Sequence, residues 1–230
     1  MYRFRNNAGL LLGLLFIICT AAPGHSAADR MRLIGTNEGL PSDYVQQLMQ
    51  DSQGYMWFAT RNGLANWDGF SMKVYKSNMR NGDILTSNSI YALAEDSAHR
   101  VWIGTTNGLN VIDKRTATVR RLHIPEFENN PISAILATRT GRLLIGSERG
   151  LFEYFPTTDS LSLFTRQRTG DVMPQTTVTS LIEDARGHIW IGTWNEGFYR
   201  LDPEGRFHAY PHTDSRKSAH VIFEDSRHRI

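Results

Sequence analysis

The sequence contains almost no cysteine. The 230-residue chain has a single one, Cys19, which lies inside an apolar run near the N-terminus. One thiol cannot form an intramolecular disulfide. The residue before it, Ile18, is also too large for the position that precedes the cysteine of a lipid-anchor signal. If this N-terminal run is removed, the remaining chain has no thiol, so its stability has to come from packing.

An excess of charge of one sign is also missing. Lys and Arg together number 25 against 23 Asp and Glu, a formal net charge of +2, and no basic run occurs. Nucleic-acid-binding domains usually concentrate basic residues on one face, so the composition disfavours that class. Hydrophobic residues make up 40% of the chain and charged residues 21%, which predicts an ordinary folded globular domain.

The motifs of the common catalytic and metal sites are absent as well. The sequence has no His-Glu-x-x-His zinc pattern, no Gly-x-Ser-x-Gly nucleophile elbow and no phosphate-binding Gly-rich loop. We therefore expect no catalytic residue, no metal site and no cofactor in this chain. Catalytic groups that converge from distant segments would escape such a motif search, so an enzyme stays open as an alternative.

The N-terminus has the layout of a secretory signal peptide. Two arginines precede the apolar run Ala8–Ala22, and small residues follow it up to Ala28. The run is shorter than the ~20 apolar residues that a membrane-spanning helix needs. We expect residues 1–28 to be a signal peptide that is cleaved after Ala28, with cleavage after Ala27 as the second choice. The mature chain would then be periplasmic, and an uncleaved N-terminal anchor is the alternative.

The most informative feature is an internal repeat. Its copies begin at positions 51, 96, 138, 184 and 225, which are 45, 42, 46 and 41 residues apart. The first copy reads DSQGYMWFATRNGL, the second DSAHRVWIGTTNGL and the fourth DARGHIWIGTWNEGF, whereas the third, TRTGRLLIGSERGL, is degenerate. A period of about 40–50 residues, with short strands and Gly-containing turns, is typical of the blades of a β-propeller.

Each copy is expected to form one four-stranded blade of an all-β fold. In the first blade we predict strands at Tyr44–Met49, Tyr55–Thr60, Leu64–Trp67 and Phe70–Tyr75. Residues 29–230 would form a partial β-propeller, with blades near 42–76, 87–122, 131–165 and 176–210 and a fifth that begins near 218.

The fifth copy stops at Ile230, inside an expected strand. We therefore expect an incomplete ring and a natural reading frame that continues further. Met31–Thr36, ahead of the first blade, is predicted to be a lone strand that would complete the last blade of a closed ring. Without its partner, such an open edge invites pairing with another chain.

Three tryptophans, Trp57, Trp102 and Trp190, occupy one position of the repeat, and Leu144 takes it in the third copy. They could stack on a sugar or on another aromatic ligand. A hydrophobic side chain that fills the space between neighbouring blades explains the leucine as well. We therefore expect the tryptophans to be structural.

Small residues and aspartates also recur at fixed positions. Gly104, Gly146 and Gly192, with Ala59 in the first copy, lie two residues after the aromatic position, which indicates close packing of strands or blades. The aspartates at positions 51, 96 and 184 are expected to cap their turns. A catalytic or calcium-binding role is disfavoured, because no cluster of acidic ligands accompanies them.

Candidate ligand-binding residues lie in the turn between the second and third strands of each blade. In a propeller this turn lies on the same face as the link to the next blade, and its residues vary while their flanks repeat. Loops on a rigid scaffold commonly carry function, although simple drift of exposed turns would explain the same variation. Trp194 is the most informative, since an exposed aromatic among polar neighbours suits a sugar or a peptide. The candidates are Arg61, Asn62, Thr106, Asn107, Glu148, Arg149, Trp194, Asn195 and Glu196.

The repeat resembles that of the two-component regulator propeller family. Blades of that family carry an Asp-x-x-Gly turn, an aromatic-aliphatic-Gly-Thr strand and an Asn-Gly-Leu turn. The chain matches them through Asp51–Leu64, Asp96–Leu109 and, with one inserted residue, Asp184–Phe198. The opening Gly39–Val45 and the corner Trp67–Phe70 are also similar to the family's first blade. The resemblance covers essentially the whole chain after the N-terminal segment.

The resemblance implies a periplasmic ligand-sensing module. In the family such modules precede a transmembrane helix and a cytoplasmic histidine kinase or diguanylate cyclase, and many form seven-bladed propellers, often two in tandem. This chain has fewer blades, no transmembrane helix after them and no output domain. It is therefore similar to the N-terminal fragment of such a sensor.

Three functions stay open at this point. The resemblance favours the sensing portion of a two-component or cyclic-dinucleotide receptor, which would bind an unknown small molecule or oligosaccharide. One alternative is a secreted or periplasmic propeller that acts on or binds polysaccharide, and an enzyme of that kind would need a converging pair of carboxylates. The other is a scaffold for a partner protein.

The expected partners follow from the open edge. Another propeller, or the chain's own missing C-terminal blades, would cover it. We expect no nucleic acid as a partner, and contact with a membrane only through a downstream segment.

Overall fold

The computed structural model describes residues 33–77, 85–164, 173, 175–210 and 218–230. All of these except Leu33 belong to one compact unit, Ile34–Ile230. The predicted signal peptide, residues 1–28, lies outside the described residues.

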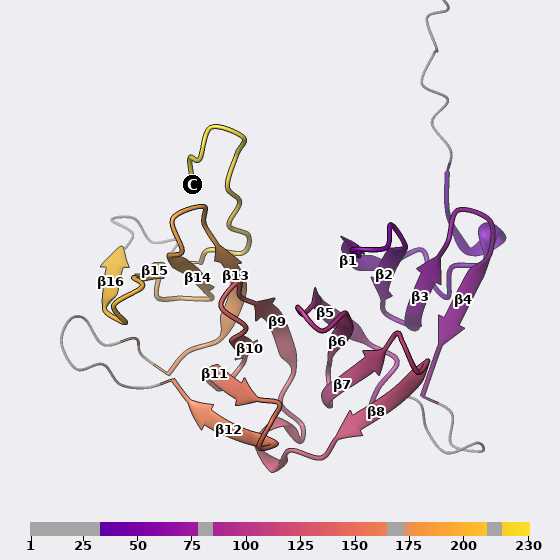
Figure 1. Ribbon diagram of the computed structural model, residues 1–230, viewed down its shortest axis with the longest axis horizontal. Coiled ribbons are helices and arrows are strands. Elements are labelled where there is room, and N and C mark those ends of the chain that lie inside the picture. The colour runs from indigo at the N-terminus through magenta and orange to yellow at the C-terminus, as the bar shows by residue number, and fades with distance from the viewer. Residues whose placement is uncertain (1–32, 78–84, 165–172, 174, 211–217) are drawn as a thin grey trace, which may run out of the picture. The chain divides into compact units, whose positions relative to one another are not determined.

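Four antiparallel four-stranded sheets make up this unit, and each sheet is formed by strands that are consecutive in the chain (Figure 1). The prediction of an all-β propeller with four-stranded blades is thereby confirmed. The first blade contains β1 (Val45–Gln50), β2 (Met56–Thr60), β3 (Gly63–Trp67) and β4 (Met72–Tyr75), and the second contains β5 (Ile90–Glu95), β6 (Arg100–Thr105), β7 (Gly108–Asp113) and β8 (Thr118–Leu122). The third contains β9 (Ile132–Ala137), β10 (Leu143–Ser147), β11 (Gly150–Phe155) and β12 (Ser160–Leu163), and the fourth contains β13 (Val178–Glu183), β14 (Ile189–Thr193), β15 (Phe198–Leu201) and β16 (Phe207–Tyr210).

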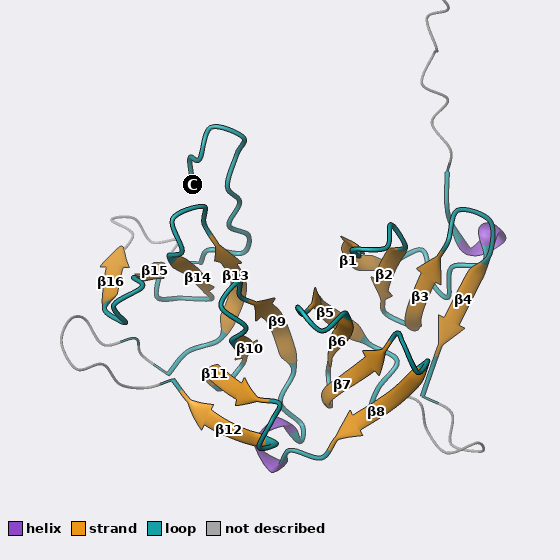
Figure 2. Cartoon of the chain, in the orientation of Figure 1, coloured by secondary structure: helices purple, strands orange, loops and turns teal. Residues whose placement is uncertain are grey.

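Helix is almost absent from the described residues (Figure 2). It is limited there to two 3-10 turns, η1 (Thr36–Glu38) and η2 (Pro125–Phe127). None of the described helical segments has the length and apolar character that crossing a bilayer requires.

The first strands of successive blades pack side by side in chain order (Figure 1). We call β1, β5, β9 and β13 the inner strands. The sheets themselves remain separate, so the described blades form an incomplete propeller.

An aspartate organises the turn between the first two strands in three of the blades. Asp184 Oδ1 accepts the backbone N–H groups of Arg186 and His188, each at 2.9 Å, and its Oδ2 accepts the indole N–H of Trp190 at 2.9 Å. The same bonds recur at the equivalent positions of the first and second blades. The predicted turn-capping role of the aspartates is confirmed.

These bonds also shift the acidity of the carboxyl group. Burial by itself would raise the pKa of Asp184, but the hydrogen bonds from Trp190 and His188 outweigh burial and lower this pKa to about 2. In the degenerate third blade both the turn aspartate and its tryptophan partner are replaced. Thr138 Oγ1 accepts the N–H of Arg142 at 3.0 Å, and Leu144 takes the place of the tryptophan.

The recurring tryptophans fill space between blades. Trp57 and Trp102 are buried, and the ring of Trp102 meets Tyr154 of the third blade edge-on at 5.5 Å. Leu144 is fully buried in a cluster with Ile189 and Ile191 of the fourth blade. The structural interpretation of this position is therefore confirmed in the first three blades, whereas Trp190 of the fourth stays partly exposed.

The recurring glycines allow the inner strand of the next blade to approach closely. A Cβ on Gly104 would lie 2.5 Å from Ile132 Cγ2, and one on Gly146 would lie 2.5 Å from Val178 Cγ1. These distances are shorter than any normal contact, so no larger residue fits without movement. The predicted close packing is confirmed.

The predicted strand Met31–Thr36 is not formed in its described part, which begins at Leu33. The backbone N–H of Gly35 donates to the Glu38 carboxylate at 2.8 Å, and that of Thr36 donates to Asp43 at 2.7 Å. These carboxylates take the donors that a strand would offer to a neighbour, and the chain turns into η1 instead. Met31 and Arg32 lie outside the described residues.

The start of the fifth copy keeps the turn but forms no regular strand among the described residues. Ser218 makes a single parallel bridge with Gly197 of the fourth blade. Asp225 Oδ1 accepts the backbone N–H groups of Arg227 and Arg229 at 2.8 and 3.0 Å. The aspartate turn therefore forms from local sequence alone.

Candidate ligand-binding site

Each inner strand carries one extra, unpaired residue. The register of β1 with β2 skips Gln46, because Val45 pairs with Thr60 and Gln47 pairs with Ala59. The same bulge recurs in β5, β9 and β13, where the unpaired residues are Tyr91, Ser133 and Thr179. A bulge re-aims the side chain of its extra residue, and bulges are common beside binding sites.

All four bulge residues line one cavity of about 920 Å³, which we call the central cavity. His220, at the equivalent position of the fifth copy, lines it as well. The remaining lining residues are Tyr44, Arg61, Glu148, Thr177 and Trp194. The central cavity is therefore built from every inner strand and from three of the turns between second and third strands.

The turns that reach the central cavity are locally rigid. In each blade the hydroxyl of the last residue of the second strand donates to the carbonyl of the turn glycine, for example Thr60 Oγ1 to Gly63 O at 2.7 Å. Gly63 adopts a φ of +129°, which explains why glycine stands there. This hydrogen bond closes the turn that carries the first turn residue.

The structure divides the nine predicted site residues by their place in the turn. The first turn residue lines the central cavity in three blades, as Arg61, Glu148 and Trp194. Thr106, the equivalent residue of the second blade, does not line it, and its hydroxyl is hydrogen-bonded to Ser87 Oγ at 2.8 Å.

The second turn residue contacts the segments before or after its blade. Asn62 donates to Pro41 O at 3.2 Å, Asn107 accepts the backbone N–H of Asn129 at 3.0 Å, and Arg149 donates to Glu126 O at 3.5 Å. Asn195 and Glu196 are exposed and are not among the residues that line the central cavity.

Three aromatic side chains line the central cavity, those of Tyr44, Tyr91 and Trp194. The guanidinium of Arg61 lies 3.7 Å from the centroid of the Tyr44 ring, a cation–π contact that orients the arginine. The ring of Trp194 is half exposed and meets His220 edge-on at 5.0 Å.

Two of the bulge hydroxyls join neighbouring blades. Ser133 Oγ donates to Val178 O, and Thr179 Oγ1 donates to Ala219 O. Each bond runs from one inner strand to the next segment of the ring. These two residues therefore fix the wall of the central cavity.

Several polar groups of the central cavity have no protein partner. Among the described residues, the side chains of Gln46, Tyr91 and Glu148 make no hydrogen bond, and His220 has only its ring contact with Trp194. A buried ligand that satisfied these groups would gain hydrogen bonds without breaking any within the protein. The arrangement suits a polar ligand with at least one flat or ring-shaped face.

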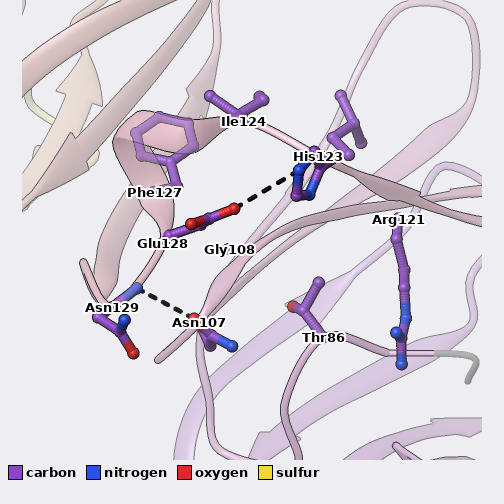
Figure 3. A pocket seen from close by; sticks show the side chains of 10 residues that line it. Thr86, Asn107, Gly108, Arg121, His123, Ile124, Phe127, Glu128 and Asn129 are labelled. Carbon is purple, nitrogen blue, oxygen red and sulfur yellow. Dashed lines mark hydrogen bonds and ion pairs between the residues drawn. The ribbon is translucent and has the colours of Figure 1, made fainter.

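A second cavity of about 410 Å³ lies beside the turn of the second blade (Figure 3). Its polar side chains are engaged with the protein. His123 Nε2 lies 3.5 Å from Glu128 Oε1, Asn107 accepts from Asn129, and Arg121 donates to Leu85 O. The central cavity is therefore the stronger candidate for a ligand site.

Sequence reasoning missed the bulge residues. Their types differ from blade to blade, so no repeated letter marks them. The one available signal is the constant spacing of five residues between each of them and the first residue of the aspartate turn. In the described part of the chain, no group of three or more His, Cys, Asp or Glu side chains is placed to hold a metal ion.

The comparisons with known proteins agree with the fold. The model of the two-component regulator propeller matches residues 39–62, 84–107 and 173–195. No curated protein matches the sequence.

Two solved structures illustrate the similarity. The extracellular domain of BT4673 from B. thetaiotaomicron, described as a one-component or a hybrid two-component system, is 25% identical with a TM-score of 0.63 over 80% of this chain. The match covers 25% of that domain, so this chain spans about a quarter of its length. Virginiamycin B lyase from Staphylococcus aureus is 16% identical with a TM-score of 0.62 and is matched over 80% of this chain and 61% of the lyase, which shows the fold alone. Three segments of the chain are therefore similar to the two-component regulator propeller repeat.

Proposed function

We propose that this chain is the ligand-recognising part of an exported signalling receptor, and that the central cavity holds a small molecule or an oligosaccharide. Its similarity to the extracellular domain of BT4673, described as a hybrid two-component system, supports a sensor propeller. The signal-peptide layout of residues 1–28 supports export to the periplasm. A kinase or cyclase output would then belong to a part of the receptor outside this chain.

One observation carries the proposal. The bulge residues and the first turn residues come from different blades, yet their uncommitted polar groups and the rings of Tyr91 and Trp194 line a single cavity. A purely structural channel would need neither free hydrogen-bonding groups nor the half-exposed ring of Trp194. Rings that stack on an apolar face, beside amide, hydroxyl and carboxylate groups, match the chemistry of sugars.

The same geometry disfavours an enzyme that cleaves polysaccharide. Such an enzyme commonly uses two carboxylates across the scissile bond. Among the described residues that line the central cavity, Glu148 is the sole carboxylate. The similarity to virginiamycin B lyase does not change this argument, because it extends to the fold alone.

A partner protein or further blades would cover the start of the fifth copy. Val221 is 81% exposed and Phe223 is 73% exposed, whereas the equivalent positions in the other blades are mostly covered. This apolar edge supports a protein contact in addition to a small ligand, not in place of one.

The proposal is tested with a panel of oligosaccharides prepared from diverse polysaccharides. Binding of the panel to the chain is measured by calorimetry, first for the wild type and then for Trp194→Ala. We expect at least one member to bind and its affinity to fall about tenfold or more in the variant, because a stacking surface is lost. Binding that is unchanged in Trp194→Ala would contradict the proposed site, and no binding across the panel would contradict an oligosaccharide ligand.

A further inference from the structure

A third cavity, of about 430 Å³, adjoins the central cavity and is lined by the next residues of the inner strands. The two cavities share five lining residues: Gln46, Tyr91, Ser133, Thr179 and His220. Because they share these walls, a single ligand can occupy both.

The remaining lining of this third cavity is chemically different. Leu48, Ala134, Ile135, Leu181 and Val221 supply aliphatic surface, and we call them the apolar floor.

Two polar side chains, Gln47 and Ser180, also line this cavity, and both are hydrogen-bonded within the protein. Gln47 donates to Leu93 O at 3.2 Å and accepts from Leu93 N at 2.7 Å, and Ser180 Oγ accepts from Ile222 N at 3.2 Å. The free polar groups of this cavity are therefore only those that it shares with the central cavity, Gln46, Tyr91 and His220, and the floor itself adds none.

Leu48 is the most accessible of the floor residues that belong to the four complete blades, and Val221 of the fifth copy is more exposed still. The Leu48 side chain is 56% exposed, whereas the residues at the equivalent position of the second and fourth blades, Leu93 and Leu181, are 2% and 8% exposed. An apolar group of a ligand would cover the accessible surface of Leu48, and burial of such surface is favourable.

We infer that the ligand of the central cavity is a small amphiphile, with a polar head among the free polar groups and a compact alkyl or aryl group on the apolar floor. This inference rests on the proposed function, because it assigns the head to the same cavity. A purely polar ligand would occupy the central cavity and leave the apolar floor empty.

The test compares octyl β-D-glucoside, below its critical micelle concentration, with methyl β-D-glucoside. Binding of each to the chain is measured by calorimetry. The octyl compound is expected to bind about tenfold or more tightly than the methyl compound, since several methylene groups leave water. Equal affinities, or no measurable binding of the octyl compound, would overturn the inference.

Two variants locate the effect. Leu48→Gln is expected to abolish the advantage of the octyl chain, and it should fold because Leu48 is largely exposed. Phe223→Gln is the matched control, since Phe223 is an exposed apolar residue that does not line the floor, and it should leave the advantage unchanged. If the octyl compound still binds more tightly than the methyl compound in Leu48→Gln, or no longer does so in Phe223→Gln, the octyl group binds somewhere other than the apolar floor. Either result overturns the inference.

A third variant separates this inference from the proposed function. If Leu48→Gln removes binding of the octyl compound but Trp194→Ala does not change it, the octyl group binds the apolar floor, but the polar head does not bind at the proposed site in the central cavity. If oligosaccharides bind in a Trp194-dependent way while the octyl group does not increase affinity, the apolar floor is not part of the ligand site. The proposed function is then still supported.

Discussion

The carboxylate of Glu95 accepts a hydrogen bond from the backbone N–H of Ser52 at 2.6 Å, across the boundary between the first and second blades. The contact recurs because a glutamate directly precedes the turn aspartate in several copies. Glu183 accepts from Arg139 N at 2.7 Å, and Glu224 accepts from Ala185 N at 3.0 Å. We call this contact the glutamate staple. The second boundary has none, because Ala137 stands at the equivalent position of the third blade.

Loss of a staple should destabilise the chain. Glu183→Ala leaves the N–H of Arg139 without its carboxylate and also removes an ion pair of 3.4 Å with the Arg139 guanidinium. We expect the free energy of unfolding to fall by about 1–3 kcal/mol, as measured by urea denaturation. Glu204→Ala is the control, because Glu204 is an exposed loop residue. A midpoint that shifts equally in both variants would contradict a specific role of the staple.

The fold should also weaken in acid. The pKa of Asp184 is lowered to about 2 in the folded chain, against about 3.9 in an unfolded one. A lowered carboxyl pKa contributes stability that is fully present above the unfolded value and is lost as the pH falls through the folded value. For Asp184 this amounts to about 2 kcal/mol, lost between about pH 4 and pH 2.

Asp184→Asn provides the comparison for this prediction. The variant should unfold more easily at pH 7, and its stability should change less between pH 4 and pH 2 than that of the wild type. Urea midpoints at a series of pH values measure both quantities. An identical pH dependence in the two proteins would show that Asp184 does not titrate as the hydrogen bonds require.

Close packing of the blades predicts a steric penalty at Gly104. Gly104→Ala should cost about 1–3 kcal/mol, because the added Cβ would meet Ile132 Cγ2. Thermal denaturation is sufficient to detect this loss. In an Ile132→Ala background the penalty of the same change should shrink, since the clashing atom is gone. An equal penalty in both backgrounds would assign the loss to something other than this contact.

The sequence predicted the framework of the fold closely. The strands of the first blade lie within about two residues of those predicted, because their turns are fixed by local chemistry: an aspartate that caps its own turn and a glycine with positive φ. The inter-blade role of Trp57 and Gly104 was also predictable, since a repeat position that must be bulky or small shows itself in every copy. In its described part, which begins at Leu33, the predicted strand Met31–Thr36 is not formed, because Glu38 and Asp43 accept hydrogen bonds from its backbone in a way that strand patterns do not reveal.

The candidate site was only half predictable. Variation within the turns pointed to Arg61, Glu148 and Trp194, but it could not separate them from Asn62 and its equivalents, which contact neighbouring segments. The bulge residues escaped altogether. A bulge arises from the pairing of two strands, and single-strand alternation in the sequence does not record which residue is left unpaired.

Alanine substitution maps the proposed binding site most directly. The affinity of the tightest ligand from the oligosaccharide panel is compared across two sets of variants. One set carries Gln46→Ala, Tyr91→Ala, Glu148→Ala or Trp194→Ala, all in the central cavity, and the other carries Asn62→Ala, Asn107→Ala or Arg149→Ala, at the second turn positions. We expect the first set to lose affinity, by about tenfold or more for Trp194→Ala, while the second set binds as the wild type does. The opposite pattern, or equal losses in both sets, would contradict a ligand site in the central cavity.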